Sequence, residues 1–186
     1  MFGMIDDDST NALELLKRDH DAVDRLFEEY DEIKDGAEDC EKEQLVGRIC
    51  HALTVHARIE ETIFYPAARR VLQEQESKDL LDEAAVEHQT LKDIIGRLEA
   101  APTDDPLFDA GVKVLSEYVK HHVREEENEL FPKVRASDMD LQAIGLQLVQ
   151  RKEQLERRGS QGAGNESRER KSSRAAGESR TSRNAH

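Results

Sequence analysis

Two stretches of the sequence place a glutamate four residues after a histidine. One is HARIEETIFYPAARR from His56 and the other is HVREEENELFPKVRA from His122, so that Glu60 corresponds to Glu126. Residues four apart lie one above the other on the same face of a helix, and each pair therefore presents a ring nitrogen and a carboxylate oxygen to one point. Such pairs are the donors of metal sites built inside helical bundles.

A single histidine stands upstream of each pair, within a second pair of similar segments. DHDAVDRLFEEY contains His20 and EHQTLKDIIGRL contains His88. The sequence therefore indicates a duplicated helical hairpin, each half of which supplies one histidine and one HxxxE pair. Four imidazoles and two carboxylates are too many donors for one tetrahedral zinc ion, but they suit two ions of the iron or manganese kind bridged by the carboxylates.

The alternative is a metal-free core. A lone histidine on an apolar helix face is more often a hydrogen-bonded core residue than a ligand. Here two carboxylates also fall on core faces opposite histidines, without Lys or Arg at neighbouring turns of those faces. Because an unpaired buried carboxylate is costly, metal ions explain the pattern better.

A second register is open in the last of these segments. His121 and Glu125 also form an HxxxE pair, but Pro132 aligns with Pro66 only when His122 is the ligand. We therefore prefer the register of His122. The remaining acids of this segment are interpreted as a solvated face, namely Glu127 and Glu129.

Four predicted helices must position these residues. Apolar residues recur at spacings of three and four without sustained alternation, which is typical of helices. Their inner faces are Leu13, Leu16, Val23, Phe27 and Tyr30; Leu45, Ile49, Leu53, Ile63 and Ala67; Leu81, Ala84, Leu91, Ile95 and Leu98; and Phe108, Val112, Leu115 and Val119. The helices are expected to begin after Asn11, near Glu41, near Lys78, and at Asp105-Pro106. Short connections predict an all-α, up-down-up-down four-helix bundle over residues 11–135.

Two further segments follow the bundle. Residues 137–157, capped by Ser137, form an additional amphipathic helix with Leu141, Ile144, Leu148 and Leu155 on one side, which we expect to lie outside the bundle. Residues 158–186 are rich in Ser, Arg and Gly and lack large apolar side chains. This composition predicts a disordered basic tail.

The charge of the chain restricts its partners. The 186 residues carry 27 Lys and Arg against 41 Asp and Glu, a net charge of −14. Residues 157–186 hold eight Arg or Lys and three Glu, a charge of +5, which leaves −19 for residues 1–156. An acidic body disfavours a nucleic-acid-binding core. The tail has the charge to contact nucleic acid, a membrane surface or an acidic partner, but we prefer the role of a solubilising extension.

Location and thiol chemistry follow from other simple features. No run of residues is long and apolar enough for a membrane span, and the acidic start is unlike a signal peptide, which predicts a soluble, cytoplasmic protein. Cys40 and Cys50 lack the spacing of a zinc ribbon and are interpreted as ordinary thiols.

Four blocks of the sequence together resemble the hemerythrin family, and more closely its HHE cation-binding branch. They are RDHDAVDRLFEEY, HARIEETIFYPAARR, EHQTLKDIIGRLEA and HHVREEENELFPKVR, within residues 11–135. The resemblance implies two non-haem iron ions in a four-helix bundle, bridged by Glu60 and Glu126 and by an oxo or hydroxo group. It also implies four terminal ligands, namely His20, His56, His88 and His122.

The chain departs from the oxygen-carrying members at one position. Those proteins have a further histidine on the third helix in an HxxxH arrangement, whereas here Lys92 follows His88 by four residues and Ala84 precedes it by four. Water, a carboxylate or a phenol could take the place of the missing ligand. The side chains considered are Glu87, Glu61 and Tyr118. For Tyr118 we prefer the role of a core aromatic whose hydroxyl bonds to a ligand.

These features predict a non-haem di-iron protein that binds or reduces a small oxidant, namely O2, H2O2 or NO. Catalase-like removal of peroxide, in defence against oxidative stress, is the enzymatic form of this prediction. The missing histidine opens the site and so favours reaction over reversible oxygen carriage. The alternative is a non-catalytic oxygen or iron sensor, or an iron-binding module, that signals through the additional helix or the tail.

Overall fold

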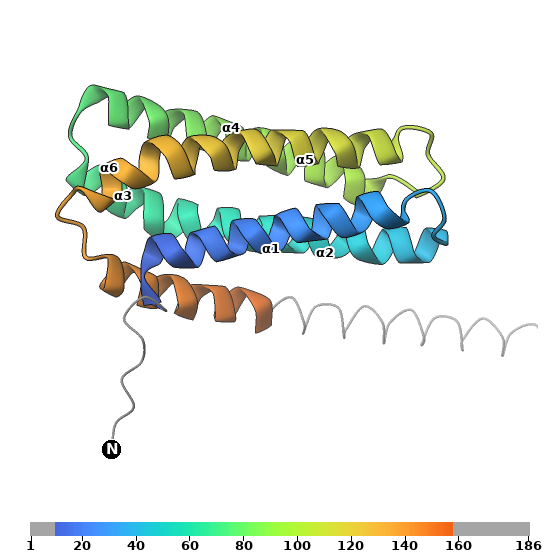
Figure 1. The fold of residues 1–186 in the computed structure, drawn as a ribbon, viewed down its shortest axis with the longest axis horizontal. Coiled ribbons are helices and arrows are strands. Elements are labelled where there is room, and N and C mark those ends of the chain that lie inside the picture. The colour runs from blue at the N-terminus through green and yellow to red at the C-terminus, as the bar shows by residue number, and fades with distance from the viewer. Residues whose placement is uncertain (1–9, 158–186) are drawn as a thin grey trace, which may run out of the picture. The chain divides into compact units, whose positions relative to one another are not determined.

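The structure, a computed structural model, describes residues 10–157, and within this range it consists of helices joined by turns, without strands (Figure 1). The predicted all-α class is therefore confirmed. The longest helices are α1 (Ala12–Ile33), α2 (Asp39–Ile59), α4 (Gln75–Ala100) and α5 (Phe108–Glu125). The predicted disordered tail, residues 158–186, lies outside the described residues, as do residues 1–9.

Two of these helices continue into shorter helical pieces. After α2 come η2 (Glu60–Phe64) and α3 (Tyr65–Val71), and after α5 come η3 (Glu126–Leu130) and α6 (Phe131–Arg135). A further helix covers residues 141–157. The two halves of the bundle thus contain the same helical pieces in the same order, as the duplicated sequence pattern predicts.

The long helices pack in a closed ring, α1 with α2, α2 with α4, α4 with α5, and α5 with α1. Helices α1 and α2 run antiparallel. His20 of α1 meets His56 of α2, while Glu29, further along α1, pairs with Arg48, further back along α2. Buried apolar side chains from all four helices meet in one common interior.

The start of α1 agrees with the sequence prediction, whereas the start of α5 differs from it. Asn11 caps α1 as predicted, because its Oδ1 accepts the N–H of Leu13 at 2.9 Å. The prediction that Asp105-Pro106 opens a helix is wrong, since α5 begins at Phe108. The Oδ1 of Asp105 accepts the N–H of Leu107 at 2.7 Å, so this aspartate closes a turn in front of the helix.

The helix over residues 141–157 begins after Asp140, not after Ser137. The Oδ1 of Asp140 accepts the N–H of Ala143 at 2.9 Å, which is the bond of a helix cap. Ser137 instead donates to the carbonyl of Val134 at 2.7 Å and so belongs to the end of α6. Helices α2 and α4 also begin earlier than predicted, at Asp39 and Gln75 rather than near Glu41 and Lys78.

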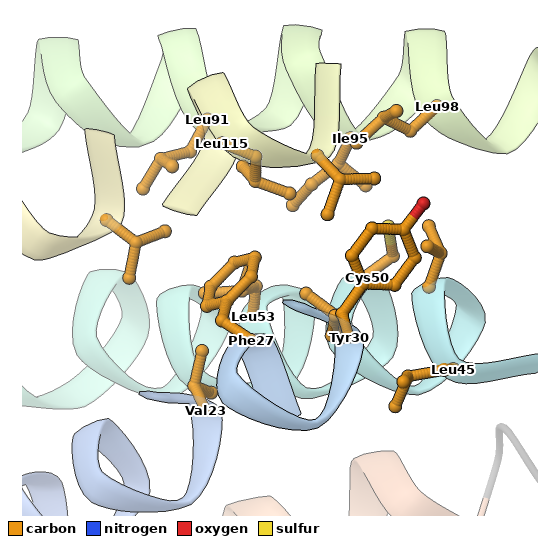
Figure 2. Close-up of a cluster of buried hydrophobic side chains, with 14 of the residues drawn as sticks. Val23, Phe27, Tyr30, Leu45, Cys50, Leu53, Leu91, Ile95, Leu98 and Leu115 are labelled. Atoms are coloured by element: carbon orange, nitrogen blue, oxygen red, sulfur yellow. The ribbon is translucent and has the colours of Figure 1, made fainter. Parts of the chain in front are cut away.

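Apolar side chains fill the interior toward the α1–α2 and α4–α5 connections. Figure 2 shows this cluster, to which each long helix contributes, for example through Phe27, Leu53, Ile95 and Leu115. Every predicted inner-face residue of the four helices is buried, except Ile63, which is half-buried. Burial of a large apolar side chain contributes about 1.5–3 kcal/mol, so this cluster fixes the helices on one side of the histidines.

Candidate metal centre

The two HxxxE segments do not continue as regular α-helices. At Glu60 and at Glu126 each helix widens into a π-helical turn, η2 and η3. The N–H of Tyr65 donates to the carbonyl of Glu60, and the N–H of Phe131 donates to the carbonyl of Glu126, five residues earlier in each case. Single turns of this kind often occur at functional sites.

A proline explains why the widened turns occur there. Pro66 and Pro132 are the second residues after the two turns. Proline has no N–H, and in an α-helix its ring clashes with the carbonyl four residues before it. On a regular α-helix Tyr65 would lie about 140° around the axis from Glu60. The wider turn brings Tyr65 back toward the face that carries Glu60.

The structure brings all six predicted ligand residues into one buried cluster. Their donor atoms fall into two groups that share Glu60, and within each group the atoms lie no more than 4.8 Å apart. No member is more than 7% exposed. The first group is His20, His56, Glu60 and Glu126, and the second is Glu60, His88 and His122.

The four histidines face one another in two pairs. The Nε2 atoms of His20 and His56 are 3.0 Å apart, and those of His88 and His122 are also 3.0 Å apart. Each pair joins two neighbouring helices, α1 with α2 and α4 with α5. All four Nε2 atoms thus point toward the interior, where the carboxylates of Glu60 and Glu126 lie.

Each carboxylate stands between the two histidine pairs. Glu60 Oε2 is 3.2 Å from Nε2 of His56 and 3.4 Å from Nε2 of His88. Glu126 Oε2 is 3.3 Å from Nε2 of His20 and 3.7 Å from Nε2 of His122. Each glutamate therefore faces one histidine of each pair.

A ring of carboxylates holds the histidines from the outside. Each Nδ1 atom faces an acid on the helical segment that comes before its own in the bundle. For His20 of α1 that acid lies on η3, the last of these segments, so the four contacts form a closed ring. The Nδ1-to-oxygen distances are 3.7 Å for His56 and Asp19, 3.2 Å for His88 and Glu61, 2.7 Å for His122 and Glu87, and 2.9 Å for His20 and Glu127. At the three shorter distances the carboxylate accepts a hydrogen bond, so Nδ1 of His20, His88 and His122 carries the proton and Nε2 keeps its lone pair for the interior.

This ring corrects two interpretations of the sequence. Glu127 is not part of a solvated face, because it accepts from His20 and this hydrogen bond lowers the pKa of its carboxyl. Glu61 and Glu87 do not take the place of the missing histidine, because their oxygens lie at the outer ring nitrogens. Lys92, which occupies that histidine's position, pairs its ammonium with Glu61 instead.

The sequence does contain a signal for this ring of carboxylates, namely the position of each acid next to a predicted ligand. Each outer acid is the immediate neighbour of a predicted ligand, and it supports a histidine on the next helix. The neighbouring pairs are Asp19 and His20, Glu60 and Glu61, Glu87 and His88, and Glu126 and Glu127.

The donors of the cluster require positive charge between them. Both oxygens of Glu60 and the Oε2 of Glu126 are buried without a hydrogen-bond partner. Burial alone would lower the pKa of His56, but the charge of Glu60 and the contact with Asp19 outweigh it and raise that pKa to about 10. The charge of His56 in turn holds the pKa of Glu60 well below its usual range, against the effect of burial.

Metal ions fit these donors. Two neutral imidazoles whose lone pairs face each other at 3.0 Å need a proton or a metal ion between them, and so do buried carboxylate oxygens without hydrogen bonds. Imidazole and carboxylate together suit divalent or trivalent ions of the first transition row.

Tyr65 is the tyrosine of this site. Its hydroxyl donates to Glu126 Oε1 at 2.7 Å and lies 3.2 Å from Nε2 of His88. Burial, together with the charges of Glu126 and Glu60, raises the pKa of Tyr65 well above its usual range. Tyr118, which the sequence suggested, is partly buried and packs against the hydrophobic cluster.

The register of His121 is excluded by the side-chain directions. The side chain of His121 is 53% exposed, whereas that of His122 is 3% exposed. His121 and Glu125 lie at the surface beside Glu87. His51 is exposed as well, five residues before His56.

The bundle and its buried His/Glu cluster define a helical protein with a candidate metal site. Residues 11–134 match the family described as "Hemerythrin HHE cation binding domain", and the chain belongs to this family. The family assignment drawn from the sequence blocks is therefore confirmed.

Several known proteins are similar to the chain. A crystal structure of a hemerythrin HHE cation-binding domain-containing protein from Mycobacterium kansasii aligns with a TM-score of 0.66 and 27% identity, over 81% of this chain and 88% of that one. An uncharacterized protein of Mycobacterium tuberculosis (strain ATCC 25618 / H37Rv) is 28% identical over 148 residues, which are 78% of this chain and 87% of that protein.

A longer relative also matches. A DNA nickase of Nostoc sp. (strain PCC 7120 / SAG 25.82 / UTEX 2576) is 30% identical over 130 residues, which are 70% of this chain. The match spans only 35% of the nickase.

Among the described residues, no helix is both long and apolar enough to traverse a bilayer.

Proposed function

We propose that the chain holds two iron ions in this cluster and uses them to bind or reduce a small oxidant, namely O2, H2O2 or NO. The observation that carries the proposal is the buried set of donors, which consists of two facing imidazole pairs and three carboxylate oxygens without a hydrogen-bond partner. The proposal includes an up-down-up-down bundle over residues 11–135, followed by the amphipathic helix over residues 141–157.

The residues divide between the two ions according to their pairing. One ion would be held by His20 and His56, and the other by His88 and His122. Each carboxylate faces one histidine of each pair, which supports Glu60 and Glu126 as bridging ligands. An oxo or hydroxo bridge completes the centre in this proposal.

When bound, two adjacent irons would supply the electrons and the open coordination position that a small oxidant needs. The chain supplies orientation, because the outer carboxylates fix each imidazole with Nε2 inward. The chain also supplies a hydroxyl group at the centre, since Tyr65 donates to Glu126 Oε1 and keeps that carboxylate in place. Apolar burial on both sides of the cluster excludes bulk water.

A hollow between α1 and α5 supports access for a small molecule. It has a volume of about 230 Å³, and its lining includes His20, Glu127, Val119, Val123 and Asn128. A diatomic molecule or a peroxide fits such a space. The lining contains both acidic and basic side chains, which favours neutral molecules over ions at this opening.

The test is the reaction of the iron-loaded chain with each oxidant. Peroxide loss and oxygen evolution report catalase-like activity, and optical spectra of the anaerobic ferrous chain report O2 and NO. We expect His122→Ala to reduce the reaction by more than about 100-fold, since removal of merely supporting residues already costs 10–100-fold. The control His51→Ala keeps the wild-type rate. Spectra unchanged by all three oxidants would overturn the proposal.

The nickase supports a second candidate, a sensor or iron-binding module. Its matched region is about a third of a longer protein that is described as acting on DNA. In this chain the metal state would then be communicated through the additional helix or the basic tail. Deletion of residues 158–186 separates the candidates, because an oxidant-reducing centre keeps its turnover whereas a tail-dependent module loses its partner.

A further inference from the structure

A second group of metal-binding side chains lies at the surface between α4 and α5, outside the six-residue cluster. His121 Nε2 is 3.2 Å from Glu125 Oε1 and 3.7 Å from Glu87 Oε1. Ligands held about 2.0–2.1 Å from one ion at tetrahedral angles are about 3.3 Å apart. The three donors lie within 4.8 Å of one another, which is close enough together for one ion to draw them in.

One of these residues belongs to both sites. Glu87 Oε2 accepts from Nδ1 of His122 at 2.7 Å, while Glu87 Oε1 faces His121. Exposure falls from the surface inward, from 53% for the side chain of His121 to 26% for Glu125 and 8% for Glu87. The group therefore leads from solvent to the outer nitrogen of a residue of the buried cluster.

A narrow hollow extends from this group of residues toward the interior. Its lining includes Glu87, Glu125, His122 and Glu126, and its volume is about 10 Å³. A single water molecule needs about that much space. The hollow therefore has room for one small ion or one water molecule, and none for a larger ligand.

The charge around this group favours a cation. Glu83 and Glu129 lie close enough to Glu125 to act on it electrostatically, in addition to Glu87. The hollow on the α1 and α5 side is different, because Lys120 and Arg124 are part of its lining. Of the two openings, the one at α4 and α5 therefore has the stronger attraction for divalent cations.

We propose that Glu87, His121 and Glu125 form an outer site for a divalent transition-metal ion, and that this ion passes from there to the buried cluster. Imidazole with two carboxylates is a donor set that takes Fe²⁺, Mn²⁺ or Zn²⁺. Glu87 is the link, since one oxygen faces the outer site and the other holds His122. The delivery step rests on the proposed function of the cluster, whereas the outer site does not.

The outer site is tested with Zn²⁺ on the full chain after iron loading. Equilibrium dialysis against micromolar Zn²⁺ should give about one Zn²⁺ per wild-type chain and none for His121→Ala or Glu125→Gln, with the iron content equal in all three. The control His51→Ala binds Zn²⁺ like the wild type. Equal Zn²⁺ binding in the wild type and both variants would overturn the outer site.

Delivery is tested by the rate of anaerobic Fe²⁺ uptake by the metal-free chain. We expect His121→Ala and Glu125→Gln to load about tenfold more slowly than the wild type, and to reach the same final iron content. Loading at the wild-type rate by variants that have lost Zn²⁺ binding would overturn delivery. A wild-type chain that takes up no iron would refute the proposed function, and the Zn²⁺ measurement would still decide the outer site.

Discussion

Replacement of Tyr65 by phenylalanine tests how the chain holds Glu126 in place. The Tyr65 hydroxyl is the hydrogen-bond partner of Glu126 Oε1, and Glu126 Oε2 already lacks a partner. Hydrogen bonds to charged groups contribute about 1.5–3 kcal/mol. For a chain of this size, 1 kcal/mol corresponds to a change in Tm of about 2–4 °C. We therefore expect Tyr65→Phe to lower the Tm of the metal-free chain by about 3–12 °C.

The assay is thermal unfolding followed by circular dichroism, with and without bound metal. The decrease should be smaller in the metal-loaded chain, because the charge of the ions stabilises Glu126. Tyr118→Phe is the matched control, since Tyr118 packs against the hydrophobic cluster. If metal-free Tyr65→Phe unfolds at the same temperature as Tyr118→Phe, the role assigned to the Tyr65 hydroxyl is refuted.

Two further predictions concern the carboxylate ring and the thiols. Glu127→Ala should weaken metal binding about 10–100-fold in a chelator competition titration, because His20 loses its outer partner. The control Glu129→Ala should leave the metal affinity unchanged. Equal affinities in both variants would contradict the role of the carboxylate ring. Cys50 is fully buried, and burial together with Glu99 raises its pKa to about 12. A disulfide reagent should therefore modify exposed Cys40 in the native chain and Cys50 only after unfolding, and fast modification of both would contradict this.

The helices and the central donors could be predicted because they follow from simple periodicities. Apolar spacing of three and four identified the inner faces, and the i, i+4 rule placed His56 with Glu60 and His122 with Glu126. Because those positions interrupt otherwise apolar faces, burial forced them toward a common interior. Sequence reasoning was therefore sufficient to bring the six residues together.

The surroundings of the cluster could not be predicted in the same way. An ideal α-helix directs Tyr65 away from Glu60, and only the π-helical turn before Pro66 reverses this direction, so that Tyr118 was suggested in its place. The outer carboxylates depend on contacts between helices, which no periodicity within one helix reports. Glu127 therefore resembled a solvated acid, although it supports His20.

The central claim is that the buried cluster binds two iron ions, and the most direct test is the iron content of the purified chain. Wild-type protein from iron-replete cells should contain two irons per chain by elemental analysis, with absorption bands of oxo-to-iron charge transfer. Glu60→Ala should lose this stoichiometry, since Glu60 lies between the two histidine pairs. One iron per chain, or none, in the wild-type protein would contradict the account.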